Sequence, residues 1–313
     1  FLTTQAKNHD LKLPLASYDD PDFFDAVRGD LPKYSAVLID EAQDYKSNWF
    51  KVIFENFLEE DGEVVVFGDE RQDVYRRGSF ERIPSVRGHT WGPWNKLKIG
   101  HRANSQIILD LATDFQKQYF GEADEVTGLP ELTFGGGTMY NWVPRNYGPA
   151  EIVSMIQSYL VRKGINPMEA VVLSQTTDIL RGVEYEYRMK TRVAAMTTFE
   201  TKEVYDRLLE TCKGKVNSKF QEELDKGRAN KKAHFTMISD RIKMSSIYSY
   251  KGWEAPCVIL LILPEPEHSD ALENRPELIY TAITRARDNL FIINMDNSTY
   301  HNFFQSQIPD GIH

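Results

Sequence analysis

The chain has 313 residues, of which 41% are hydrophobic and 27% charged, and its formal net charge is -9. This composition excludes a disordered or fibrous chain, and the negative charge argues against a protein that coats nucleic acid by bulk charge. Cys212 and Cys257 stand apart from any His/Cys cluster. The sequence therefore predicts neither a metal–thiolate site nor a disulfide framework, and it favours a reducing compartment such as the cytoplasm.

Short apolar runs alternate with amphipathic segments. In chain order we expect a strand at 35–39, a helix at 48–59, a strand at 63–67, a helix at 107–120, a strand at 138–143, a helix at 150–162, a strand at 170–174, helices at 200–212 and 218–229, strands at 242–247 and 258–263, a helix at 277–287 and a strand at 290–294. Strands that are apolar throughout indicate a parallel sheet with helices on both faces, and therefore an α/β fold. The longest apolar run, 257–263, has the length of a strand, so we expect no membrane span.

The first candidate site is the stretch VLIDEAQDY at 37–45, where an apolar strand ends in two carboxylates. In parallel sheets, ligands bind at the carboxyl ends of strands. Asp40 is suited to hold a magnesium ion through water, and Glu41 to polarise a water molecule for hydrolysis. The alternative for such a pair taken alone is an acidic surface turn.

The second candidate is VFGDERQDVYRRG at 66–78, where another apolar strand ends in Gly-Asp. The amide of Gln72 both donates and accepts, so it could sense a terminal phosphate or its attacking water. Tyr75 offers a flat face to a base, although a half-buried core tyrosine is the alternative. Residues 71–102 hold eight basic and two acidic residues, a balance of +6, which favours a phosphate track. Residues 213–243 hold nine and four, a balance of +5, and solvated faces explain them equally well.

Three further stretches complete the series: LKIGHR at 97–102, MSSIYSYKGWE at 244–254 and LIYTAITRAR at 278–287. Arg102 and Arg285 are candidates for arginines that reach a nucleotide and stabilise the charge of a departing phosphate. We expect Arg285 to lie on the predicted 277–287 helix.

Taken in this order, the motifs resemble the C-terminal two-thirds of superfamily 1 helicases of the UvrD/Rep type, over about residues 37–294. The resemblance implies a RecA-like P-loop NTPase architecture and an ATP-driven motor that travels 3′ to 5′ on single-stranded DNA and unwinds duplexes. Among the matching positions, Asp40, Glu41, Gln72, Arg102 and Arg285 would carry the chemistry, with Asp40 and Glu41 as the Mg²⁺ site.

The resemblance also implies two ligand-binding sets. ATP would be bound by Asp40, Glu41, His101, Arg102, Gly252, Glu254 and Arg285, with Glu254 at the sugar. Single-stranded DNA would lie along Tyr75, Arg77, Ser246, Tyr248 and Lys251, and RNA remains an alternative. The chain departs from the family pattern at Arg77, at Gly100-His101 and at Tyr248, where the family usually has an aromatic residue, Asn-Tyr and His.

The phosphate-binding loop of the family is missing. No Gly-x-x-x-x-Gly-Lys-Ser/Thr run occurs in the chain, and the glycines at 135–137 lack the lysine. Only 39 residues precede Asp40, whereas the family places the loop well upstream of that strand. We therefore expect a piece of a longer protein that binds ATP weakly by itself and is inactive alone.

The resemblance predicts two domains. Residues 1–94 would be the C-terminal part of a first RecA-like domain, and 95–313 a second RecA-like domain with a small insertion at about 182–240. Two other functions stay open: a nucleic-acid-binding module, and an ATP-driven switch in a nuclease or defence complex, which a joined nuclease domain or subunit would favour. The oligomeric state is not fixed by these patterns.

Overall fold

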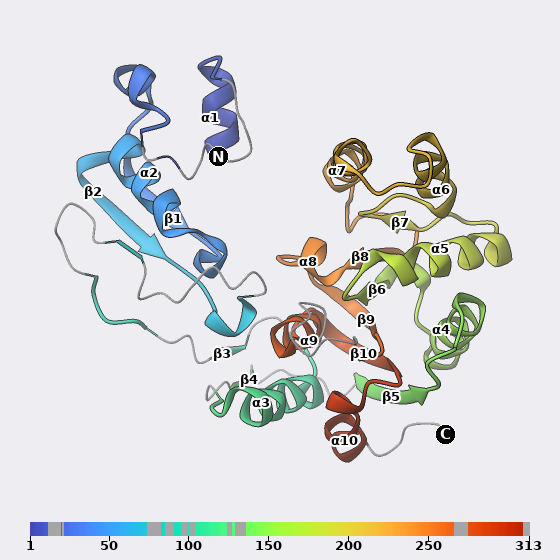
Figure 1. The fold of residues 1–313 in the computed structure, drawn as a ribbon. Coiled ribbons are helices and arrows are strands. Elements are labelled where there is room, and N and C mark those ends of the chain that lie inside the picture. Colours follow the sequence, from blue (N-terminus) through green and yellow to red (C-terminus); the bar gives the residue numbers. More distant parts are fainter. Residues whose placement is uncertain are drawn as a thin grey trace. The chain divides into compact units, whose positions relative to one another are not determined.

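The computed structural model describes residues 1–11, 20, 22–73, 83–84, 91–95, 99–100, 104–123, 127–128, 136–265 and 275–308. Two compact units make up the chain, Phe1–Lys96 and Leu97–His313 (Figure 1). The domain limits and the insertion derived from the sequence stay predictions. No helix in these ranges combines the length and apolarity that crossing a membrane demands.

Unit 1 is built around two parallel strands joined by a helix. Its elements are α1 (Leu2–Asn8), the 3₁₀ helix η2 (Asp25–Asp30), β1 (Tyr34–Ile39), η3 (Ala42–Asp44), α2 (Ser47–Phe57), β2 (Leu58–Val66) and η4 (Glu70–Gln72). The parallel register runs from Ala36 opposite Glu63 to Ile39 opposite Val66. The predicted strand–helix–strand order is confirmed, although β2 begins five residues earlier than expected.

The prediction that the strands of unit 1 are buried throughout is wrong. Val37, Ile39 and Val66 pack with α2, but Leu38 is 67% exposed and Val65 is 43% exposed. Successive side chains on a strand point to opposite faces, and α2 covers one face of this pair. The sequence reads as a two-sided buried strand because both faces are apolar, whereas only one is covered in the described residues.

Unit 2 contains most of the regular structure. Its elements are β3 (Ile99–Gly100), α3 (Gln106–Phe120), β4 (Thr127–Gly128), β5 (Gly137–Val143), α4 (Pro149–Lys163), η6 (Pro167–Glu169), β6 (Ala170–Ser174), α5 (Thr177–Thr191), β7 (Met196–Thr197), α6 (Lys202–Thr211), α7 (Ser218–Ala233), β8 (Lys243–Ser246), α8 (Ile247–Tyr250), β9 (Ala255–Ile262), α9 (Pro276–Ile283), β10 (Ala286–Met295) and α10 (Ser298–Gln307).

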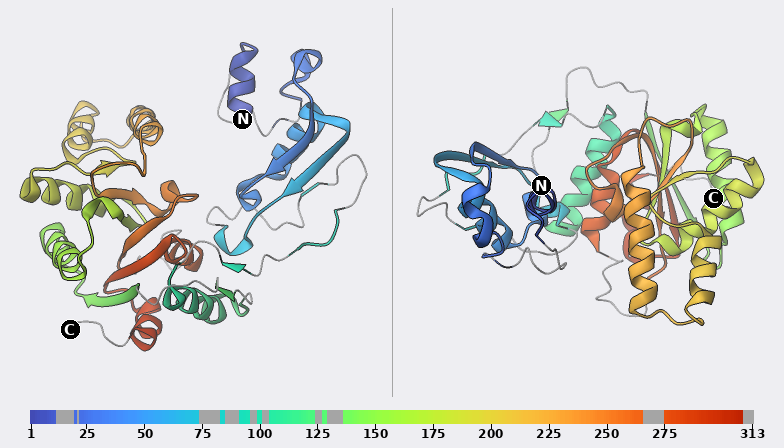
Figure 2. Two further views of the ribbon diagram at one scale, coloured as in Figure 1. Left: turned by 180° about the vertical axis from the view of Figure 1, so that it is seen from behind. Right: turned by 90° about the horizontal axis from the view of Figure 1, so that it is seen from above.

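A six-stranded sheet with the order β5-β10-β9-β6-β8-β7 forms the centre of unit 2, and each neighbouring pair is parallel (Figure 1). Helices α4 and α5 pack on one face, and α3 and α9 pack on the other (Figure 2). This arrangement confirms the α/β prediction of a parallel sheet flanked by helices.

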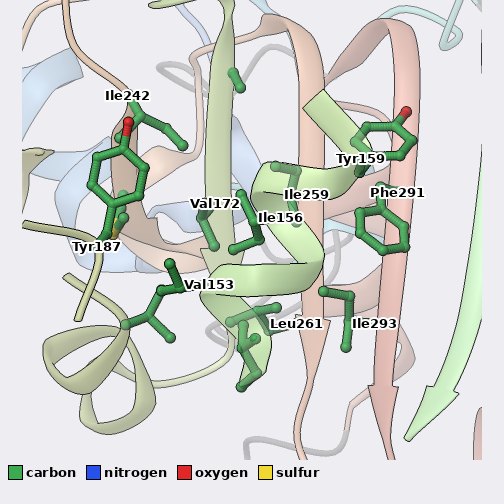
Figure 3. Packing of buried hydrophobic residues seen from close by; sticks show 14 of the residues in the cluster. Val153, Ile156, Tyr159, Val172, Tyr187, Ile242, Ile259, Leu261, Phe291 and Ile293 are labelled. Atoms are coloured by element: carbon green, nitrogen blue, oxygen red, sulfur yellow. The ribbon is translucent and has the colours of Figure 1, made fainter. Parts of the chain in front are cut away.

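The main core lies between the sheet and α4–α5. Ile156 of α4 lies over Val172, Ile259 and Leu261 of the central strands, and the ring of Tyr159 stacks on Phe291 at 4.5 Å (Figure 3). The intervening residues of β9, Val258, Leu260 and Ile262, are equally buried on the opposite face. Burial on both faces explains why these strands are apolar without alternation.

Helix α4 shows how local sequence fixes an element. Pro149 occupies the first turn, where a missing N–H costs nothing, and Glu151 complements the positive end of the helix dipole. The helix ends at Gly164, whose φ of +64° is a left-handed conformation that glycine adopts easily. These signals lie close to the predicted ends at 150 and 162.

The predicted helix over 277–287 is too long. Helix α9 ends at Ile283, and Ala286 already belongs to β10, where it pairs with Ala255 of β9. Arg285 therefore lies in a turn between helix and strand. No Gly or Pro follows Ile283 in this stretch, so no local signal marks the end of the helix, and sheet pairing overrode helix propensity.

Helices α6 and α7 form a hairpin with a small core of its own, which includes Cys212, Phe220 and Leu224 (Figure 2). Its contacts with α5 are largely polar. The carboxylate of Glu200 accepts hydrogen bonds from Arg181 at 2.7 Å and from Arg228 at 2.8 Å. The two helices predicted here are confirmed, while their status as an insertion stays a prediction.

The glycine run at 135–137 has a packing role at Gly136. A Cβ atom added there would lie 1.9 Å from the carbonyl oxygen of Asp288. The chain before β5 thus approaches the beginning of β10 more closely than any side chain permits. This contact accounts for a glycine that, in sequence, could suggest a phosphate loop.

Candidate functional site

The acidic turn of unit 1 lies at the carboxyl end of β1. Asp40 follows the strand directly, and its Oδ1 accepts a hydrogen bond from the Glu41 backbone N–H at 2.9 Å. Glu41 has a φ of +52°, which is uncommon for a residue with a side chain and is often found at functional sites. The turn is held to the neighbouring strand, because Ala42 N–H donates to the Phe67 carbonyl at 2.9 Å.

The second predicted motif lies at the carboxyl end of β2, beside the first. Asp69 caps η4 by accepting from the Arg71 N–H at 3.0 Å, and its other oxygen accepts from Gln72 Nε2 at 2.8 Å. Gln72 is buried. The parallel pairing of β1 with β2 therefore brings Asp40, Glu41 and Gln72 to one end of one sheet, as the sequence predicted.

Gln43 joins these two turns and was not predicted as a site residue. Its Nε2 donates to Glu41 Oε2 at 2.7 Å, and its Oε1 accepts from the Asp69 N–H at 3.1 Å. The side chain is buried. The only sequence signal is the amide itself, which stands between acidic residues in the DEAQD stretch.

The acidic turn also changes the chemistry of a neighbour. Burial raises the pKa of the Tyr45 hydroxyl, and the negative charges of Asp40 and Asp44 raise it further. Negative charge at Asp40 and Asp44 therefore disfavours ionisation of the Tyr45 hydroxyl.

The donor set of the turn fits magnesium. Mg²⁺ is commonly held by one or two carboxylates, with waters and substrate phosphates completing an octahedron. Asp40 is exposed and Glu41 is half-buried, so ligands can reach both. Within the described ranges, no group of three His, Cys, Asp or Glu side chains offers an alternative metal site.

In unit 2, Arg285 and Glu254 lie at the amino ends of adjacent strands. Ala255 N–H donates to the Arg285 carbonyl at 3.0 Å, which ties the start of β9 to the start of β10. The Arg285 side chain is 1% exposed. Its Nε donates to the Thr281 carbonyl at 3.2 Å and its Nη2 to Thr284 Oγ1 at 3.1 Å.

Glu254 is more open and faces a second arginine. Its side chain is 42% exposed, that of Arg287 is 39% exposed, and Arg287 Nη1 lies 3.9 Å from Glu254 Oε1. Gly252, two residues earlier, has a φ of +88°, which a glycine tolerates in this turn. The sequence prediction missed Arg287, although it is the second arginine of the TRAR stretch.

Ser246 and Tyr248 lie at the opposite, carboxyl end of the sheet. Ser246 caps α8, because its Oγ accepts the Ser249 N–H at 3.3 Å. Its neighbour Ser245 shares a 2.8 Å hydrogen bond with Thr198. Ser246 is level with Leu261 of β9, six residues beyond Ala255, so about 20 Å of strand separates this end from Glu254.

For the remaining predicted site residues, the structure describes only Lys251. Lys251 is half-buried in the turn between α8 and β9. Tyr75, Arg77, His101 and Arg102 lie outside the described residues, as does most of the basic stretch 71–102. Their predicted roles stay predictions.

Comparison with known proteins gives one family. Residues 242–293, from the start of β8 almost to the end of β10, match the UvrD-like helicase C-terminal domain. Among solved structures, the chain is similar to the C-terminal domain of a possible DNA helicase from Lactobacillus plantarum WCFS1, at 11% identity and a TM-score of 0.36 over 63% of this chain and 89% of that one. Curated proteins gave no match. Residues 242–293 therefore support a likeness to the C-terminal part of UvrD-type helicases.

Proposed function

We propose that the chain is the C-terminal portion of an ATP-dependent helicase or translocase that moves 3′ to 5′ on single-stranded DNA. The observation that carries the proposal is the helicase domain match over 242–293, which includes Ser246, Glu254 and Arg285. The carboxylate pair of unit 1 supports it independently, because that pair lies outside the matched range.

Unit 1 would bind Mg²⁺ and polarise the attacking water. Asp40 and Glu41 would hold Mg²⁺, which when bound would neutralise charge on the terminal phosphates of ATP. Glu41 would orient and polarise the attacking water, and Gln72 would contact the terminal phosphate with its amide. These roles require the side chains to converge, which the hydrogen bonds between the two turns already impose on Glu41, Gln43 and Gln72.

Unit 2 would contact the nucleotide with residues at the amino end of its sheet and the DNA strand with residues at the carboxyl end. Arg285 and Arg102 would contact the terminal phosphate, and Glu254 would accept a hydrogen bond from the sugar. Ser246 and Tyr248, at the carboxyl end of β8, would face the DNA strand. Helix α8 and the turn to β9 connect the two ends within residues 247–254, so a shift at one end can be transmitted to the other.

The test is ATP hydrolysis by the full-length gene product with and without single-stranded DNA, and with Glu41→Gln. We expect DNA-stimulated turnover that falls about 10²- to 10⁴-fold in Glu41→Gln, the usual contribution of a general base. Glu55→Gln, an exposed carboxylate of α2, is the matched control and should turn over normally. Equal turnover by wild type and Glu41→Gln would refute the assignment.

One observation favours a second candidate, a nucleic-acid-binding or switch subunit without its own motor activity. The 313 residues contain no Gly-x-x-x-x-Gly-Lys-Ser/Thr run, so this chain alone should bind ATP weakly. Titration with a fluorescent ATP analogue checks this point, and tight binding by the chain alone would contradict it. Intact single-strand binding by a full-length product without turnover would favour the second candidate.

A further inference from the structure

Gln43 occupies a position where both halves of its amide are used. It is 1% exposed and lies in η3, between the turn after β1 and the turn after β2. The NH₂ group donates to the Glu41 carboxylate, and the carbonyl accepts from the Asp69 backbone. A buried amide that satisfies two partners in different turns fixes the distance between them.

The hydrogen bonds continue beyond Asp69. Its carboxylate accepts from the amide of Gln72 and from the backbone of Arg71. A continuous path of hydrogen bonds therefore runs from Glu41 through Gln43 and Asp69 to Gln72. It crosses from the end of one strand to the end of its neighbour through two carboxylates and two amides, and it passes through the backbone of Asp69.

We propose that Gln43 is a positioning residue that couples Gln72 to Glu41. This proposal rests on the proposed function, in which Gln72 contacts the terminal phosphate and Glu41 orients water. A movement of Gln72 would displace Asp69, and Asp69 would displace the side-chain carbonyl of Gln43. The NH₂ group of Gln43 would then turn the carboxylate of Glu41. Glutamate at position 43 would place a second carboxylate against Glu41, and leucine would remove both hydrogen bonds.

The first test needs no nucleotide and uses the chain described here. Gln43→Leu should speed hydrogen exchange of the Asp69 N–H roughly tenfold, since that N–H loses its buried acceptor. Gln43→Glu keeps an acceptor and should leave this exchange close to wild type. Asn56→Leu is the matched control, because Asn56 is also a buried amide with two hydrogen bonds in unit 1 but lies in α2. Unchanged Asp69 exchange in Gln43→Leu would overturn the proposal.

The second test measures coupling in the full-length gene product. The ratio of DNA-stimulated to basal ATP turnover should collapse in Gln43→Leu, Gln43→Glu and Gln72→Leu, while Asn56→Leu keeps it. The double variant Gln43→Leu/Gln72→Leu should be no worse than either single one, because both break the same path. A wild type without turnover would overturn the proposed function and this role with it. A stimulated wild type whose ratio survives in Gln43→Leu would overturn the role of Gln43 alone.

Discussion

The candidate site residues of the two units are presented in opposite ways. In unit 1, Asp40 and Glu41 lie at the carboxyl end of β1, in a turn that ligands can reach. In unit 2, Arg285 lies at the amino end of a strand and is buried, with its guanidinium held by Thr281 and Thr284. In the proposed function, the carboxylates of unit 1 are accessible to a cation as they lie, whereas Arg285 would have to be uncovered before it could contact a phosphate.

The largest effect is expected from Arg285→Ala. If the buried guanidinium reaches the phosphate during turnover, DNA-stimulated hydrolysis should fall on the order of 10³- to 10⁵-fold, as for other arginines of this kind. Arg287→Ala removes a half-exposed arginine two residues away and should have a much smaller effect. Stopped-flow hydrolysis by the two variants checks this, and normal turnover in a folded Arg285→Ala would make Arg285 purely structural.

The sheet of unit 2 is covered by helices on both faces, whereas in the described residues the sheet of unit 1 is covered on one face. One substitution in each sheet measures what this difference contributes to stability. Ile259→Ala, in the fully buried β9, should lower the free energy of unfolding of unit 2 by about 2–5 kcal/mol through lost burial and a cavity. Leu38→Ala, on the exposed face of β1, should change the stability of unit 1 by about 0.5 kcal/mol or less. Urea unfolding monitored by circular dichroism gives both values. A large loss in Leu38→Ala would show that this face is covered in solution.

The two basic stretches can be compared by salt dependence. Binding of a labelled single-stranded oligonucleotide should weaken with salt, with a log-log slope of roughly 0.7 for each phosphate contacted. Arg76→Gln/Arg77→Gln should reduce the slope by about 1.4, since two contacts are lost. Lys213→Gln/Lys215→Gln, at the connection between α6 and α7, is the control and should leave it unchanged. An equal reduction in both double variants would remove the reason to assign the track to residues 71–102.

The smallest effect concerns the core beneath α4. Burial raises the pKa of Tyr159 above its usual 10.0, and among the described residues its buried hydroxyl has no hydrogen-bond partner. The unfolded chain therefore loses this proton at a lower pH than the folded chain. The contribution of Tyr159 to the free energy of unfolding is fully present below pH 10 and declines as the pH rises above it. Tyr159→Phe should reduce that decline in unit 2, measured by urea unfolding on both sides of pH 10. Tyr34→Phe, exposed in unit 1, should not. An identical decline in Tyr159→Phe would assign it to other groups.

Local sequence was sufficient where the signals are local. The apolar run at 170–174 predicted β6 with its observed ends, and Pro149 and Gly164 bracket α4. The placement of the candidate residues of unit 1 was also predictable. Two apolar runs that end in acidic turns imply parallel strands whose carboxyl ends meet, and this is how Asp40, Glu41 and Gln72 come together.

Tertiary structure decided the rest, because it depends on partners far away in the chain. Pairing with Ala255 ended α9 before Arg285, and the same contact placed Arg285 beside Glu254. The exposure of Leu38 follows from which face α2 covers, which strand composition cannot state. The hydrogen bond that joins Gln43 to the second turn depends on Asp69, 26 residues away, whose N–H donates to its carbonyl oxygen. Residue types and their order identify which side chains could carry the chemistry, and the packing of the strands decides which of them lie together.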